Sequence, residues 1–231
     1  MIVFLLKNKI PEMNRKPKVK ICCISSVEEA RMAIEAGASA IGLVGPMPSG
    51  PGIISNELIA EIAKQIPPSI ETFLLTSETK VEHIIAHYKK VKTTTIQLVD
   101  ALEGRNYKVL KTALPEVKIV QVIHVLNEAS IKEALEIAPE VDALILDSGN
   151  PNLKVKELGG TGKTHNWNLS KQIVERSNTP VYLAGGLKPE NVQAAMEQVQ
   201  PYGLDLCSGV RTNKQLDQSK LKAFMEKVNA S

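Results

Sequence analysis

The stretch VYLAGGLKPENVQAAMEQVQPYGLDLCSG, residues 181–209, holds one complete strand–helix–strand unit. The run VYLAGG (181–186) is short and apolar and ends in two glycines, as a buried strand entering a turn does. A helical pattern follows in KPENVQAAMEQV (188–199), with a proline that suits a first helical turn. A second short apolar run, LDLCSG (204–209), completes the unit. Two strands joined through a helix are expected to lie parallel in one sheet.

The same alternation runs through the rest of the chain. Helical patterns separate six further apolar runs, which are VKICCI (19–24), AIGLVG (40–45), ETFLLT (71–76), TIQLVD (95–100), KIVQVIHV (118–125) and DALILDS (142–148). Two of the helical patterns, 26–37 and 130–138, open with a serine followed three residues later by a glutamate, which predicts capping boxes. Eight units in 231 residues fit a single-domain (β/α)₈ TIM barrel over 17–231, after a loose extension over 1–16. An open doubly wound sheet is the alternative, weakened because no GxGxxG follows the first run.

Composition excludes several classes of function. A net charge of +3 and an aromatic content of 3% do not favour nucleic-acid binding. No apolar run is long enough to span a membrane. Three cysteines without a CxxC pair indicate a reduced, cytoplasmic protein, and the spacing of its four histidines predicts no metal site. Nothing in the sequence decides between a monomer and a homodimer.

Glycine-bearing turns follow the last three apolar runs. In such barrels phosphate binds at the loops after strands 7 and 8, where glycine lets backbone N–H groups approach the anion. A phosphorylated substrate is therefore expected at Gly159, Gly160, Gly185, Gly186, Ser208 and Gly209. Lys163 could add positive charge there, or could be a solvated loop lysine.

Five segments carry a resemblance to a known family. They are KICCIS (20–25), DALILD (142–147), GGTGKTHNW (159–167), YLAGGLKPENV (182–192) and YGLDLCSGV (202–210). Together they resemble phosphoribosylanthranilate isomerase of tryptophan biosynthesis. The resemblance implies a (β/α)₈ barrel that performs an Amadori rearrangement of an aminoaldose phosphate without a cofactor. It also implies that Cys22 is the general base and Asp147 the general acid.

These roles make physical demands on both residues. A thiolate base needs a lowered pKa, and a carboxylic acid needs a raised one. Alternation along a strand places Cys22 and Cys23 on opposite faces, so only one should line the barrel. The structural alternatives are that Cys22 is a small core residue and that Asp147 caps a turn.

The sequence departs from the family pattern on the side of the aromatic group. The family's SPR arginine, which binds the anthranilate carboxylate, is missing from PSGPGIIS (48–55), and Gly52 stands about where it should be. QLVD replaces QLHG and brings in Asp100, and CSGVR replaces SSGVE and brings in Arg211. Arg211 and His124 are candidate replacement cations, whereas Asp100 could contact substrate or cap a helix.

Three interpretations of the function stay open. The chain is an isomerase with a rebuilt carboxylate site, an isomerase of another phosphosugar amine, or a non-catalytic barrel that binds a phosphorylated ligand. Schiff-base chemistry is disfavoured because Lys18, Lys20 and Lys118 begin their strands, away from the end where barrel enzymes work.

Overall fold

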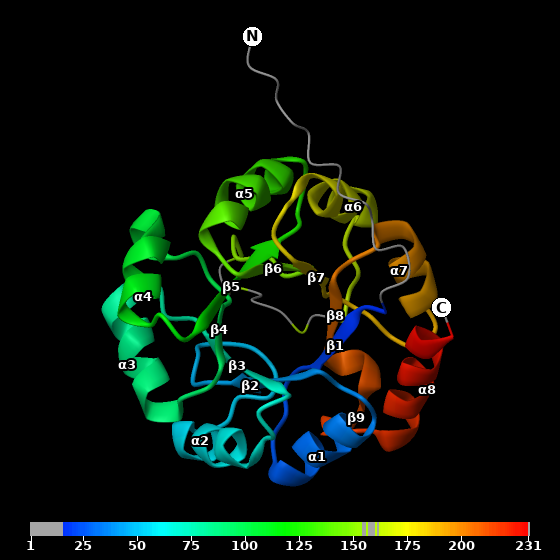
Figure 1. Ribbon diagram of the computed structural model, residues 1–231. Helices are drawn as coiled ribbons and strands as arrows, with labels where there is room; N and C mark the ends of the chain where they lie inside the picture. Colours follow the sequence, from blue (N-terminus) through cyan, green and yellow to red (C-terminus); the bar gives the residue numbers. More distant parts are fainter. Residues whose placement is uncertain (1–15, 154–155, 157–159, 161, 231) are drawn as a thin grey trace.

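Eight parallel strands close into a barrel in the computed structural model, which describes residues 16–153, 156, 160 and 162–230 (Figure 1). The strands are β1 (Lys18–Ile21), β2 (Ala40–Val44), β3 (Glu71–Thr76), β4 (Thr95–Leu98), β5 (Lys118–His124), β6 (Ala143–Asp147), β7 (Val181–Leu183) and β8 (Gly203–Leu206). Each pairs with the next, and β1 pairs with β8 from Lys18↔Gly203 to Ile21↔Leu206. The predicted (β/α)₈ barrel is therefore confirmed, and the open doubly wound sheet is excluded.

Helices cover the outside of the barrel (Figure 1). They are α1 (Val27–Glu35), α2 (Asn56–Gln65), α3 (Val81–Val91), α4 (Tyr107–Ala113), α5 (Ala129–Ile137), α6 (Trp167–Arg176), α7 (Val192–Val199) and α8 (Gln218–Asn229). In the described part of the chain, none of them has the length and apolar character needed to cross a bilayer.

The two predicted capping boxes have different outcomes. The side chain of Ser26 caps α1 by accepting a hydrogen bond from the Glu29 N–H, as expected, but the Glu29 carboxylate accepts from the N–H of Ser25 rather than from that of Ser26. The Ser130 prediction is wrong, because α5 begins at Ala129 and Ser130 is buried in its first turn. There its hydroxyl donates to the carbonyl of His124 at 3.1 Å and holds the helix against the end of β5.

Two apolar layers result from the alternation of side chains along the strands. The larger layer lies between strands and helices and contains residues such as Ile41, Ile119 and Phe224. A smaller cluster lies inside the barrel and includes Phe73 and Val122. The interior is thus a packed core, and a cavity can open only at its ends.

The predicted extension over 1–16 falls almost wholly outside the described residues. Lys16, its last residue, is described, and its ammonium group donates to the carbonyl of Asn229 at 3.0 Å. At the other end of the barrel sequence, the short strands β9 (Arg211–Thr212) and β10 (Gln215–Leu216) form a hairpin that leads from β8 into α8.

Candidate active site

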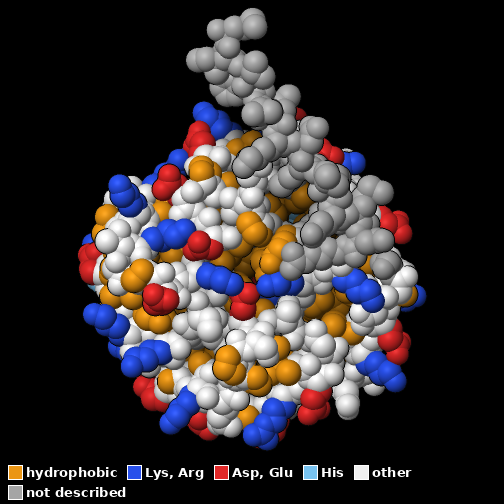
Figure 2. Space-filling model, in the orientation of Figure 1, with side chains coloured by type: hydrophobic (Ala, Val, Ile, Leu, Met, Phe, Trp, Pro, Cys, Tyr) orange, Lys and Arg blue, Asp and Glu red, His pale blue; other side chains and the backbone are white. Residues whose placement is uncertain are grey.

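A cavity opens at the carboxyl ends of the strands, where barrel enzymes carry out their chemistry. It is lined by residues of several strand ends and the loops that follow them, among them Cys22, Cys23, Val44, Met47, Pro51, Leu75, Gln97, Val99, Asp147, Gly160, Gly162, Ala184, Gly185, Gly186, Asp205, Cys207 and Ser208. Figure 2 shows apolar side chains gathered in the hollowed centre of this face, with charged side chains around them. The cavity therefore combines an apolar wall with a few ionisable groups.

Cys22 lies one residue beyond β1 and is buried. Its N–H donates to the carbonyl of Leu206 at 2.8 Å, which continues the pairing of β1 with β8. A hydrogen bond with the Cys23 thiol and attraction to the Lys20 ammonium lower the pKa of Cys22, against the opposing effect of burial. A lowered pKa is the property that the predicted role of Cys22 requires.

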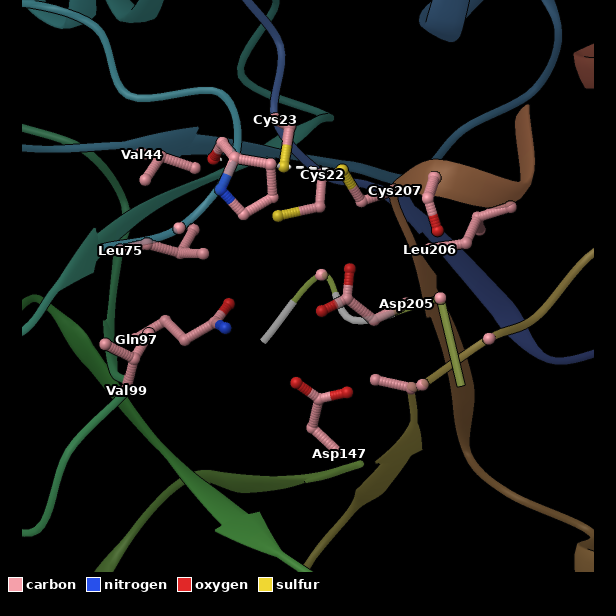
Figure 3. A pocket seen from close by; sticks show the side chains of 18 of the residues that line it. Cys22, Cys23, Val44, Leu75, Gln97, Val99, Asp147, Asp205, Leu206 and Cys207 are labelled. Carbon is pink, nitrogen blue, oxygen red and sulfur yellow. Dashed lines mark hydrogen bonds between the residues drawn. The ribbon is translucent and has the colours of Figure 1, made fainter. Parts of the chain in front are cut away.

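Both vicinal cysteines line the cavity, so the expectation that they face opposite sides is wrong. The alternation rule applies only while the backbone is extended. Here β1 ends at Ile21, and Cys23 adopts a φ of 63°, in the left-handed region. The chain therefore turns between the two residues, and both thiols reach the cavity (Figure 3).

Asp147 is the last residue of β6 and is 7% exposed. Burial raises its pKa to about 6, although the Ser148 N–H donates to its carboxylate at 2.8 Å and acts in the opposite direction. A carboxyl group with such a pKa retains a protonated fraction near neutral pH and can donate that proton. Figure 3 shows its carboxyl group pointing into the cavity that the Cys22 thiol also lines.

A buried ion pair that the sequence analysis missed lies next to these two residues. The Lys20 ammonium contacts the Asp205 carboxylate at 2.8 Å, with exposed side-chain fractions of 0% and 7%. Burial opposes the charge on Lys20, yet attraction to Asp205 raises the pKa of Lys20, so it remains an ammonium. A Cβ atom on Gly42 would lie 3.0 Å from the Lys20 nitrogen and 2.9 Å from the Cys22 sulfur, which places these two atoms within about 6 Å of each other.

The position of Lys20 corrects the earlier assignment of this residue to the end of the barrel remote from the chemistry. Lys20 is the third of the four residues of β1, and its ammonium lies inside the barrel, 5.1 Å from the centre of the Phe73 ring. The available signal was a single charged residue inside each of two apolar runs, Lys20 in VKICCI and Asp205 in LDLCSG. Because charged residues are almost never fully buried without a partner, such positions indicate a pair.

Most of the residues expected at the phosphate line the cavity. Gly160, Gly185, Gly186 and Ser208 line it. Gly186 has a φ of 61°, and a Cβ there would lie 2.6 Å from the backbone carbonyl carbon of Lys163. Only glycine therefore allows the turn after β7 to pack this closely against the loop before α6.

Three other residues of this prediction are not part of the described lining. Gly159 is outside the described residues. Gly209 does not line the cavity; it packs so tightly against Leu187 that a Cβ would lie 1.9 Å from the carbonyl oxygen of that residue. Lys163 is exposed and is not part of the lining either.

Arg211 does not reach the cavity lining. Its guanidinium contacts the Glu29 carboxylate at 2.9 and 3.1 Å and donates to the carbonyl of Cys23 at 2.6 Å. Despite burial, these hydrogen bonds with Glu29 raise the pKa of Arg211. Arg211 thus ties the β8–α8 connection to the backbone just after β1, and Glu29 is its counter-charge.

His124 and Asp100 also stand apart from the lining. His124 is buried at the end of β5, its Nε2–H donates to the carbonyl of Val99 at 3.1 Å, and burial lowers its pKa. Asp100 forms an ion pair with Lys156. In the described residues, no group of three or more His, Cys, Asp and Glu side chains is arranged to hold a metal ion.

The sequence comparisons indicate one family. The family model described as N-(5'phosphoribosyl)anthranilate (PRA) isomerase matches residues 19–227. N-(5'-phosphoribosyl)anthranilate isomerase 2 of Methanosarcina mazei is 35% identical over 213 residues, which cover 91% of this chain and 93% of that protein. The corresponding isomerase of Methanocella arvoryzae is 31% identical, with 93% and 99% covered.

Solved structures give the same result. The phosphoribosylanthranilate isomerase of Thermotoga maritima superposes with a TM-score of 0.78 at 28% identity, over 93% of this chain and all of that one. Another isomerase of this kind, in complex with reduced 1-(o-carboxyphenylamino)-1-deoxyribulose 5-phosphate, superposes with a TM-score of 0.75 at 25% identity, over 93% of this chain and all of that one.

Proposed function

The chain belongs to the N-(5'-phosphoribosyl)anthranilate isomerase family of tryptophan biosynthesis, and we propose that it performs this isomerisation with Cys22 as general base and Asp147 as general acid. One observation carries the assignment of the two roles. A thiol with a lowered pKa and a carboxyl group with a raised pKa open into the same cavity. These are the opposite shifts that divide base and acid roles between two groups.

The chemistry follows from these two protonation states. Protonated Asp147 donates its proton to the ring oxygen of the aminoaldose, the C1–O bond breaks, and an iminium forms between C1 and the amine nitrogen. The Cys22 thiolate then removes the proton from C2. The electron pair of the C–H bond forms a C1–C2 double bond, and the resulting enolamine tautomerises to the aminoketose. Asp147 and Cys22 exchange only protons with the substrate, and substrate and product are isomers, so no external oxidant or reductant takes part.

The cavity offers separate surfaces for the two ends of this substrate. We assign the phosphate to the wall formed by Gly160, Gly185, Gly186 and Ser208, where turns bring backbone close to the ligand. Gly159 remains a predicted member of this group, whereas Gly209 is left out because it does not line the cavity. We assign the aromatic ring to the apolar side chains of the lining, which are Val44, Met47, Pro51, Leu75 and Val99.

A second candidate substrate is favoured by one feature of the described lining. None of its residues is Arg or Lys, and Gly52 occupies about the position of the family's carboxylate-binding arginine. An isomerase of a phosphoribosylamine without a carboxylate on the aromatic group would suit this cavity. Comparing kcat/KM for phosphoribosylanthranilate and phosphoribosylaniline separates the two: preference for the former by more than about tenfold supports a carboxylate clamp.

The test of the proposed function is turnover of phosphoribosylanthranilate generated in situ, followed by the loss of its fluorescence. Cys22→Ala and Asp147→Asn should each lower kcat by about 10²–10⁴-fold, the usual contribution of general acid–base catalysis. Asp142→Asn is the matched control. Asp142 lies just before the first residue of β6, at the opposite end of this strand from Asp147, and it pairs with Lys111. Full activity of either site variant would overturn the role assigned to that residue.

Two further properties belong to this proposal. The substrate is a small phosphorylated molecule, in keeping with the ligand of the related isomerase complex. We also propose a cytoplasmic enzyme that is a monomer or a homodimer, which is supported by its three free cysteines and by the dimeric T. maritima relative. Light scattering at working concentration measures the oligomeric state.

A further inference from the structure

We propose that Cys23 and Cys207 are a modification site, a thiol pair that hydrogen peroxide converts reversibly into a disulfide, and that this bond lowers the isomerase activity. The effect on activity rests on the function proposed above. Formation of the bond itself does not, because it depends only on the two thiols and their surroundings.

The two sulfur atoms are already close together. The Cys207 thiol points at the Cys23 sulfur, with an Sγ–Sγ distance of 2.6 Å (Figure 3). A disulfide needs about 2.05 Å, so the sulfurs must approach by only about half an ångström. The backbone supports this position, because Cys23 and Cys207 follow β1 and β8, which are hydrogen-bonded neighbours through Ile21↔Leu206.

Cys23 has a backbone conformation that is unfavourable for any residue with a side chain, and the surrounding backbone nevertheless leaves space for that side chain. Cys23 has a φ of 63°, which costs a non-glycine residue about 1–2 kcal/mol. Gly52 makes room for it, since a Cβ there would lie 2.5 Å from the Cys23 Cβ. A glycine at position 23 would avoid this cost and remove the thiol, so the strained cysteine points to a use for its sulfur.

Cys207 is the partner that geometry favours over Cys22. Consecutive Cα atoms are about 3.8 Å apart, below the usual range of about 4.4–6.8 Å for bridged cysteines. A bond between the adjacent residues Cys22 and Cys23 would therefore distort the backbone. Cys207 is partly exposed and lines the cavity, so a small oxidant can reach it, and the buried Cys23 lies beside it.

The reaction balances with one molecule of peroxide. The Cys207 thiolate attacks one peroxide oxygen, the O–O bond breaks, and the leaving hydroxide takes up a proton to give water. The resulting sulfenic acid is attacked by the Cys23 sulfur, its S–O bond breaks, and a second water leaves with the Cys23 proton. The two sulfurs lose two electrons, which the peroxide gains, and a dithiol reductant reverses the bond by exchange.

The disulfide is expected to lower activity by changing the pKa of Cys22. The Cys23 thiol donates to the carbonyl of Pro51 in the cavity lining at 3.6 Å, and its interaction with Cys22 is the largest cause that lowers the pKa of Cys22. A disulfide has no S–H to donate, so oxidation removes this support and leaves a smaller fraction of thiolate at neutral pH. The bond also restrains the backbone at Cys207 and therefore at the next residue, Ser208, which lines the cavity where we place the phosphate.

The experiment treats the reduced, full-length protein with hydrogen peroxide and reads thiols and activity in parallel. We expect titratable thiols to fall from three to one, peptide mapping to find Cys23 joined to Cys207, and activity to fall by about tenfold or more, with recovery in dithiothreitol. Cys207→Ser supplies the control. The ratio of its activity after and before peroxide should stay near one, whatever its initial activity.

Other outcomes overturn the proposal. Three free thiols after treatment, or a mapped bond between Cys22 and Cys23, would show that this pair does not form the disulfide. If Cys207→Ser loses activity with peroxide as fully as the unmodified protein, oxidation acts directly on Cys22 and the bond has no controlling role. A protein that forms the mapped bond but never turns over phosphoribosylanthranilate would fail the proposed function and retain the modification site.

Discussion

Replacement of Lys20 by methionine tests the buried ion pair beneath the proposed catalytic groups. Methionine has a similar length and no charge, so Lys20→Met leaves the Asp205 carboxylate in place without its counter-charge. At a separation of 2.8 Å, and with an effective dielectric constant of about 20, the attraction between the two charges is about 6 kcal/mol. The cost of removing both groups from water offsets part of this attraction. Removal of one partner of a buried ion pair typically destabilises the protein by about 3–5 kcal/mol.

The expected result is therefore a loss of about 3–5 kcal/mol in the free energy of unfolding, measured by urea denaturation followed by circular dichroism. The double variant Lys20→Met/Asp205→Leu should recover most of this loss, because it buries no unpaired charge. Lys118→Met is the matched control, since Lys118 pairs with Glu71 at 2.9 Å but is 56% exposed. Exposed pairs contribute about 0–1 kcal/mol.

Lys20→Met should also change the chemistry of Cys22. Removing the ammonium takes away one cause of the lowered pKa and leaves the opposing charge of Asp205 unbalanced. The pH dependence of Cys22 alkylation, mapped by mass spectrometry, should therefore shift to higher pH. The reasoning is refuted if Lys20→Met costs less than about 1 kcal/mol, if the two single changes are additive, or if the Cys22 profile does not move.

Three further predictions concern the rest of the site. The rate should fall as pH rises through about 6 and Asp147 loses its proton, and pH–rate profiles of the unmodified protein and Asp147→Asn check this. Arg211→Met should cost about 3 kcal/mol in urea denaturation with little change in KM, because it leaves the Glu29 carboxylate unpaired; a large rise in KM at unchanged stability would contradict this. Gly186→Ala should raise KM and weaken protection by inorganic phosphate in thermal unfolding, because its Cβ collides with the Lys163 backbone.

The barrel could be predicted from the sequence because its signals are local. Each apolar run is short and bounded by turn residues, and eight of them alternate with helical patterns. The start of α1 follows from Ser26 and its neighbours in the same way. The Ser130 prediction failed because a tertiary contact, the hydroxyl bond to His124, decided the position of that serine.

The site was predictable only where a residue's place on a strand decides its position. Asp147 ends β6 and Cys22 follows β1, so both reach the mouth of the barrel. Arg211 is different, because its direction depends on Glu29, which lies 182 residues away along the chain. The Lys20–Asp205 pair spans 185 residues, and no spacing rule in one sequence connects two such positions.

The charges around the cavity explain why one carboxyl group there can arrive protonated while another stays ionised. Asp205 forms an ion pair with Lys20, so the Lys20 ammonium neutralises its negative charge. Asp147 has no such partner among the described residues; burial raises its pKa first, and the charge of Asp205 adds to the effect. The Lys20 ammonium meanwhile favours the thiolate of Cys22. A single buried cation therefore helps to separate the roles, since it pairs with Asp205 and lowers the pKa of Cys22, whereas burial raises the pKa of Asp147 and leaves it a proton to donate.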